Sequence, residues 1–263
     1  MFRALTPVVK NLLLITVGIY VITSYFLPEL KGLFALYYIE SKFFMPFQFL
    51  TYMFMHADFW HLFSNMLGLF IFGPLLEQFL GPKKLIILWM VCGIGSGVLY
   101  SGYTAYQMNS LDNKIEQFSF NPDPEEFNRF VSQNNHLFGP GVYDLIDDFS
   151  RNPENESYID RAHQNMIGVR DLKADIPMVG ASGALFGVLI AFGMLFPNTQ
   201  LFLLFPPMPI KAKYLVLFYG LYTVYNIFVS NPMDNVAHFA HLSGLMIGAV
   251  LVLVWKKDRT NFY

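Results

Sequence analysis

The chain has 263 residues, of which 54% are hydrophobic and only 14% are charged. Soluble domains average about 25% charged residues, so this composition argues against a water-soluble fold and indicates a protein that lies in a lipid bilayer. The formal net charge of −2 gives no sign of nucleic-acid binding, which normally brings a basic surplus. The single cysteine, Cys92, cannot form an intramolecular disulfide, and its apolar surroundings favour a buried free thiol.

Six apolar segments predict membrane spans, each of which needs about 20 residues. In chain order they are Val8–Leu27, Trp60–Leu80, Leu85–Tyr106, Met178–Phe196, Tyr214–Ser230 and Val236–Trp255. A further apolar run, Leu201–Pro209, is too short to cross and contains three prolines. We expect that run to form a loop that dips into or lies on the membrane interface. The predicted fold class is therefore an all-α bundle of six transmembrane helices.

Lysine and arginine near the helix ends predict the orientation of these spans, because such residues favour the cytoplasmic side. They are Arg3, Lys10, Lys83, Lys84, Lys211, Lys213, Lys256, Lys257 and Arg259. If six spans alternate, all nine lie on one side, whereas Lys31 and Lys42, in the loop after the first span, lie on the other. The first span shows no cleavage pattern and is expected to be a retained anchor. The sequence thus predicts a multi-pass protein of the bacterial cytoplasmic membrane, with both termini in the cytoplasm.

An acidic insert, 107–176, separates helices 1–3 (residues 1–106) from helices 4–6 (residues 177–263). It contains 13 acidic and 6 basic residues. Asp123 and Pro124 have the composition of a helix start, and glycine and proline punctuate the rest. We expect short amphipathic helices that pack against the outer ends of the spans, although a disordered loop is the alternative. Their apolar sides should carry Phe127, Phe130, Val131, Tyr143, Leu145, Ile146 and Phe149.

Polar side chains gather at the starts of three predicted spans. These are His56, His61 and Asn65 near the second span, Ser182 at the fourth, and His238 and His241 at the sixth. In an alternating topology all three helix starts lie at the same, outer membrane face. Because polar groups inside a membrane are costly, this convergence indicates a functional site.

Ser182 and His241 are the candidate nucleophile and base. Ser182 lies in a predicted first helical turn, where backbone N–H groups are free to stabilise an oxyanion. If the two helices adjoin, the imidazole can accept the serine proton and later return it to the leaving amine. Small residues at spacing four, Ala240, Gly244 and Gly248, would permit that close approach. Taken alone, the serine motif favours helix packing over catalysis, and the histidine motif favours a hydrogen-bonded structural histidine.

His61 and Asn65 are one helical turn apart and share a face. Both can donate hydrogen bonds to a tetrahedral intermediate, at roughly 3–4 kcal/mol for one such donor. A polar pair that binds a neighbouring helix is the alternative. For His56 the sequence favours a structural hydrogen bond within its loop, and His238 is a possible supporting group next to His241.

Four stretches in this order resemble the rhomboid family of intramembrane serine proteases. They are His56-Ala-Asp-Phe-Trp-His61-Leu-Phe-Ser-Asn65, Glu77-Gln-Phe-Leu-Gly81, Gly180-Ala-Ser182-Gly183 and Ala240-His241-Leu-Ser-Gly244. The resemblance implies a Ser182–His241 dyad without a third acidic member. It also implies an oxyanion site made of His61, Asn65 and the Ser182 N–H, with no metal or other cofactor. Its expected substrates are transmembrane helices of other proteins, cut near the membrane surface.

The chain departs from the family pattern at two places. The Trp-Arg pair that many members carry in the first outer loop is replaced by Phe47-Gln48. Four residues after the nucleophile, where some members have tyrosine, this chain has Phe186, whose ring can still support the imidazole.

Three other readings remain open at this point. The first is a catalytically inactive relative that binds transmembrane clients. The second is a metal-dependent membrane protein, although no His-Glu-x-x-His motif is present. The third is a transporter, which would usually show an inverted repeat.

Overall fold

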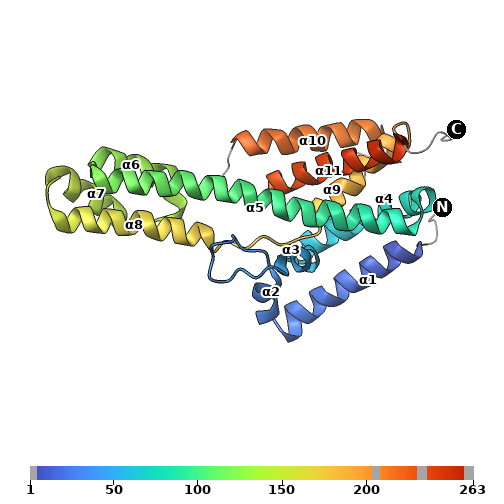
Figure 1. The fold of residues 1–263 in the computed structure, drawn as a ribbon, viewed down its shortest axis with the longest axis horizontal. Coiled ribbons are helices and arrows are strands. Elements are labelled where there is room, and N and C mark those ends of the chain that lie inside the picture. The colour runs from blue at the N-terminus through green and yellow to red at the C-terminus, as the bar shows by residue number, and fades with distance from the viewer. Residues whose placement is uncertain (1–4, 203–207, 230–235, 258–263) are drawn as a thin grey trace. The chain divides into compact units, whose positions relative to one another are not determined.

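The computed structural model describes residues 5–202, 208–229 and 236–257. The chain forms two compact units (Figure 1). The bundle unit comprises Met1–Leu36, Met45–Ser101 and Pro177–Tyr263, and the insert unit comprises Tyr37–Phe44 and Gly102–Ile176. One helix, α5 (Pro82–Phe120), contributes residues to both units.

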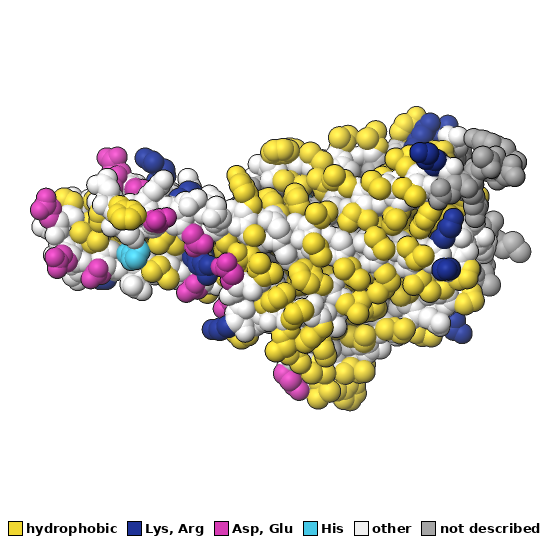
Figure 2. All heavy atoms as spheres, in the orientation of Figure 1, with side chains coloured by type: hydrophobic (Ala, Val, Ile, Leu, Met, Phe, Trp, Pro, Cys, Tyr) yellow, Lys and Arg dark blue, Asp and Glu magenta, His cyan; other side chains and the backbone are white. Residues whose placement is uncertain are grey.

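The bundle unit consists mainly of long apolar helices. They are α1 (Pro7–Val21) with its π-helical continuation η1 (Ile22–Phe26), α4 (Phe59–Leu80), α5, α9 (Ser182–Leu195), α10 (Ala212–Val229) and α11 (His238–Lys257). Short helices lie between η1 and α4, namely α2 (Glu29–Phe34), α3 (Gln48–Thr51) and the 3-10 helix η2 (Tyr52–Phe54). Figure 2 shows hydrophobic side chains over much of the visible face of this unit, as expected for a surface in contact with lipid.

Five described helices are long and apolar enough to span a membrane, namely Pro7–Phe26, Phe59–Leu80, Pro82–Phe120, Ala212–Val229 and His238–Lys257. The predicted fourth span, 178–196, contains instead the 14-residue helix α9. At 1.5 Å per residue, α9 is about 21 Å long, less than the roughly 30 Å of a bilayer core. The all-helical membrane bundle is confirmed, whereas the count of six spans stays a prediction.

Glycines let the backbones of α9 and α11 touch. A Cβ atom at Gly244 would lie 2.1 Å from the Gly183 carbonyl oxygen, and one at Gly248 would lie 2.8 Å from the Gly187 Cα. Neither distance leaves room for a side chain. Because these glycines follow the first residues of the two helices, the helix starts of α9 and α11 lie close together.

Glu77, in the second matching stretch, ties α4 to the start of α1. Its two carboxylate oxygens accept hydrogen bonds from the backbone N–H groups of Val8 and Val9, both at 3.0 Å. A helix start has unsatisfied donors and a positive dipole end, so a carboxylate there is favourable. α4 ends at Leu80, and Gly81 caps it with a φ of +84° that suits glycine.

The segment after α9 differs from its prediction. Gln200–Phe202 (β1) and Pro209–Lys211 (β2) pair as a short antiparallel ladder, where the sequence predicted only a loop. Pairing the two ends satisfies backbone groups that an apolar environment would leave without partners. Residues 203–207 of the predicted loop lie outside the described residues.

The insert unit has its own helices and its own core. α5 continues to Phe120, well past the span end expected at Tyr106, and is followed by α6 (Pro124–Gln133), η3 (Asn135–Leu137), α7 (Gly141–Arg151) and α8 (Glu156–Ala174). Phe118, Phe127, Phe149 and Met166 are fully buried at the centre of this unit. Among the predicted apolar positions Tyr143 is wrong: it is 54% exposed, because it lies beside the stripe formed by Val142, Leu145, Ile146 and Phe149 on α7.

The Gly183–Gly244 contact predicts a large effect of a single methyl group. Gly244→Ala should lower the free energy of unfolding by about 2 kcal/mol, because the added Cβ must push two backbones apart. Gly18→Ala is the matched control: Gly18 lies inside α1, where an added Cβ would meet no atom within 4 Å, so alanine should be neutral or stabilising. Thermal unfolding in detergent measures both, and a Gly244→Ala protein as stable as the native chain would contradict the packing argument.

Candidate active site

Ser182 and His241 lie side by side. Ser182 is the first residue of α9, and His241 lies in the first turn of α11. The His241 Nε2 and Ser182 Oγ atoms are 2.8 Å apart, although the two residues are 59 positions apart in the sequence. This is the distance at which an imidazole can take the proton of a serine hydroxyl. The glycine contacts between α9 and α11 bring the two residues together.

Phe186 holds the plane of the His241 ring. It lies one turn after Ser182 on α9, and its ring stacks on the imidazole with 4.2 Å between centroids and an interplanar angle of 11°. The Phe186 ring also meets Tyr219 of α10 edge-on, with centroids 6.2 Å apart. The aromatic ring is thus present where the family pattern has tyrosine in some members, without the hydroxyl.

His61 lies against the loop that leads to Ser182. Its backbone N–H donates to the Asp58 carboxylate at 2.9 Å, which caps the start of α4. Gly180 has a φ of +121°, in the region that favours glycine. A Cβ atom there would lie 2.6 Å from His61 Nε2. Gly180 must therefore be glycine for two reasons, its backbone conformation and its contact with the imidazole.

Asn65, the second predicted oxyanion donor, is buried on α4. Its side-chain nitrogen donates to the His61 carbonyl oxygen at 3.0 Å. One of its N–H groups is therefore engaged within its own helix. An amide nitrogen has two hydrogens, so the other is left for a further acceptor.

Both additional histidines lie next to a ring of the site. His56 is fully buried, and its ring meets His61 edge-on with centroids 5.1 Å apart. His238 is buried at the start of α11, and its ring meets His241 edge-on at 5.9 Å. Burial, and then repulsion by His61, lower the pKa of His56 to about 3, so His56 is neutral at physiological pH.

The loop before Ser182 is held from two sides. Leu36 and Met178 exchange backbone hydrogen bonds at 2.9 and 2.8 Å, and the Gly180 N–H donates to the Tyr52 carbonyl oxygen at 3.0 Å. Tyr52 was not among the predicted site residues, because nothing in the sequence pattern distinguishes it. Of the Phe47-Gln48 pair, Gln48 is fully buried and donates to the Leu33 carbonyl at 3.0 Å, so it fastens the segment between η1 and α4 without a charge.

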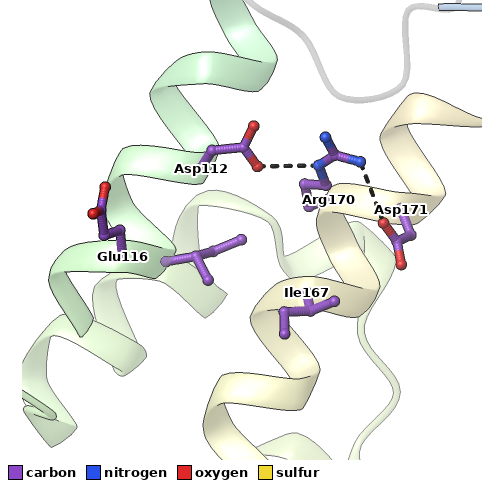
Figure 3. A pocket seen from close by; sticks show the side chains of 6 residues that line it. Asp112, Glu116, Ile167, Arg170 and Asp171 are labelled. Atoms are coloured by element: carbon purple, nitrogen blue, oxygen red, sulfur yellow. Dashed lines mark hydrogen bonds and ion pairs between the residues drawn. The ribbon is translucent and has the colours of Figure 1, made fainter. Parts of the chain in front are cut away.

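A metal site and a pocket in the insert unit are two other places where a functional site could lie. Among the residues that the structure describes, no three His, Cys, Asp or Glu side chains lie close enough together to hold a metal ion. The insert unit has a hollow of about 410 Å³ lined by Asp112, Ile115, Glu116, Ile167, Arg170 and Asp171. Figure 3 shows Arg170 between Asp112 and Asp171, at 3.0 and 3.5 Å. None of the predicted site residues lines this hollow.

Comparison with known proteins gives a match to the rhomboid domain over residues 44–112 and 157–257. RHOMBOID-like protein 12, mitochondrial, of Arabidopsis thaliana is 25% identical over 213 residues, which are 81% of this chain and 47% of that protein. Rhomboid-like protein 11, chloroplastic, of the same plant is 34% identical over 88 residues, which are 34% of this chain and 30% of that protein. The chain thus spans less than half the length of either relative. Both names refer to plant organelles and do not support the predicted bacterial membrane.

The low pKa of His56 predicts how stability depends on pH. Above about pH 6.5 the ring is neutral in the folded and the unfolded chain. As the pH falls from 6.5 toward 3, the unfolded chain takes up a proton that the folded chain excludes. The free energy of unfolding should therefore fall by about 1.4 kcal/mol per pH unit from this group alone.

His56→Gln removes the titrating group. Between pH 6 and 4.5 the free energy of unfolding of this variant should therefore depend less steeply on pH than that of the native chain. The carboxylates contribute equally in both proteins. A direct NMR titration gives the same test without a variant. Protonation of the His56 ring near pH 6 in the folded protein would contradict the prediction.

Proposed function

Because this chain belongs to the rhomboid family, we propose that it is an intramembrane serine endopeptidase that cuts peptide bonds in or near transmembrane helices of other membrane proteins. The observation that carries the proposal is the 2.8 Å approach of Ser182 Oγ and His241 Nε2. The stacked Phe186 ring, at 4.2 Å, supports it, because a base must keep its orientation through two proton transfers.

In the first step the Ser182 Oγ attacks the carbonyl carbon of the substrate, and His241 takes the hydroxyl proton. The resulting tetrahedral intermediate carries a negative oxygen. It collapses to an acyl-enzyme when the C–N bond breaks, and His241 gives its proton to the leaving amine. A water molecule then attacks the ester, with His241 again as the base, and Ser182 is released.

Three donors are available for the oxyanion. The Ser182 N–H lies at the first position of α9, where backbone donors have no partner within the helix and meet the positive end of its dipole. His61 lies against Gly180, two residues before the nucleophile, and Asn65 keeps a second amide hydrogen. Loss of one such donor typically costs about 100- to 1,000-fold in rate.

The expected substrates follow from the membrane setting. A peptide bond inside a helix is shielded by its own hydrogen bonds and by lipid. The substrate helix must therefore unwind locally at the cut, and residues that weaken a helix, such as glycine, should promote cleavage. The proposed partners are transmembrane-helix substrates and the lipid bilayer, with no nucleic acid.

We also propose that both termini are cytoplasmic and that the dyad faces the opposite side. Lys84, at the start of α5, lies over the ring of Trp255 near the end of α11, 5.3 Å from its centroid. Lys256 donates to the Met194 carbonyl at the end of α9. Basic residues of α5 and α11 thus share the end of the bundle away from Ser182, as the distribution of lysines favours.

The test is cleavage of a model single-span substrate by the purified protein in detergent. Ser182→Ala and His241→Ala should each lower the cleavage rate by about 1,000-fold or more, because the loss of either residue leaves the other without its catalytic role. The matched control is Ser243→Ala on α11, whose hydroxyl donates to the Phe239 carbonyl of its own helix; it should cleave at the native rate.

Cleavage by Ser182→Ala at the native rate would overturn the proposal. Binding of single-span proteins without cleavage, equal in native and Ser182→Ala chains, would instead favour the catalytically inactive client-binding relative.

A further inference from the structure

Tyr52 connects α5 to the loop that precedes the nucleophile. It lies in η2 and is only 2% exposed. Its hydroxyl donates to the Gly93 carbonyl oxygen of α5 at 2.7 Å. Its own carbonyl oxygen accepts the Gly180 N–H at 3.0 Å. A single residue thus joins a long helix of the bundle to a backbone group two residues before Ser182.

The surface of α5 is shaped to receive this residue. A Cβ atom at Gly97 would lie 3.0 Å from the Tyr52 ring, and one at Gly93 would lie 2.0 Å from the end of Met53. A side chain at Gly97 would press on the rigid Tyr52 ring, whereas one at Gly93 would displace the flexible end of Met53. Burial raises the pKa of the Tyr52 hydroxyl, so the group is a neutral donor at any physiological pH.

The position of Gly180 determines where the His61 ring can lie. With a φ of +121°, Gly180 brings its Cα against the imidazole, so closely that a Cβ atom would lie 2.6 Å from His61 Nε2. The Gly180 N–H has its partner in Tyr52, and a shift of η2 would carry the loop with it. A displacement of about 1 Å at a reacting centre can cost roughly 100-fold in rate.

We propose that Tyr52 is a positioning residue for the oxyanion side of the site. Its hydroxyl fixes η2 on α5, and its carbonyl holds Gly180 against the His61 imidazole. This inference rests on the proposed function, since it assigns His61 a part in the chemistry of Ser182. It adds a residue that acts through Gly180 and His61 and does not itself touch the substrate.

The test compares Tyr52→Phe with the native chain by the rate at which a fluorophosphonate labels Ser182. Phenylalanine keeps the ring packing and removes the hydroxyl, which donates to Gly93 and also meets the Gly97 backbone of α5. We expect labelling to slow by about tenfold, a smaller effect than loss of a whole oxyanion donor. Tyr103→Phe is the matched control: it removes a tyrosine hydroxyl that belongs to α5 itself and accepts a hydrogen bond from Gln107 at 3.1 Å, and it should leave the rate unchanged.

Both tyrosine variants are then measured again with His61→Ala. If Tyr52 acts through His61, its hydroxyl should make no difference to the rate once the imidazole is gone, because the two changes are coupled. Labelling is compared well below the unfolding temperature of every variant. A Tyr52→Phe protein that labels at the native rate, or one slowed tenfold both with and without His61, would overturn the inference.

The labelling rate of Ser182 is measured without any proteolysis, so it tests the role of Tyr52 independently of the proposed function. A native chain that is labelled at Ser182 but cuts no transmembrane substrate would contradict the proposed function. The ratio of labelling rates would still decide the role of Tyr52.

Discussion

The backbone contact between α9 and α11 is the constraint on which the candidate site depends. A Cβ atom at Gly244 would lie 2.1 Å from the Gly183 carbonyl oxygen, so the two helices are as close as their backbones allow. Ser182 directly precedes Gly183, and His241 lies three residues before Gly244. The contact therefore sets the separation of the serine and the imidazole without long side chains, whose ordering would cost conformational entropy.

The rest of the site is built from backbone groups and buried rings around this contact. Phe186 fixes the base from one side, while the left-handed Gly180 brings the serine loop against His61. His56 is enclosed next to His61 as a neutral ring. Such conformations persist only where their surroundings hold them, and here the segment between η1 and α4 does so through Tyr52 and the Leu36–Met178 bridge. Most of the insert unit lies outside this account of the site, since the rhomboid match omits residues 113–156.

Hydropathy and the alternation of spans predicted the helices and the dyad, because both follow from side-chain chemistry. The family resemblance, carried by motifs in order on those helices, is confirmed. The features that the sequence analysis did not predict depend on residues that are distant in the sequence but adjacent in the structure. The continuation of α5 to Phe120 and the β1–β2 ladder are set by packing and backbone pairing. Tyr52 contributes partly through its carbonyl oxygen, which every residue possesses, so no sequence pattern could single it out.

The most direct test of the dyad is to identify the residue that reacts with a fluorophosphonate in the native chain. Mass spectrometry of the labelled protein locates the bond that forms when a serine oxygen displaces fluoride from phosphorus. We predict a single adduct, on Ser182, that is lost when His241 is replaced by alanine. A native chain that stays unlabelled, or an adduct on Ser182 that forms equally fast without His241, would contradict the account.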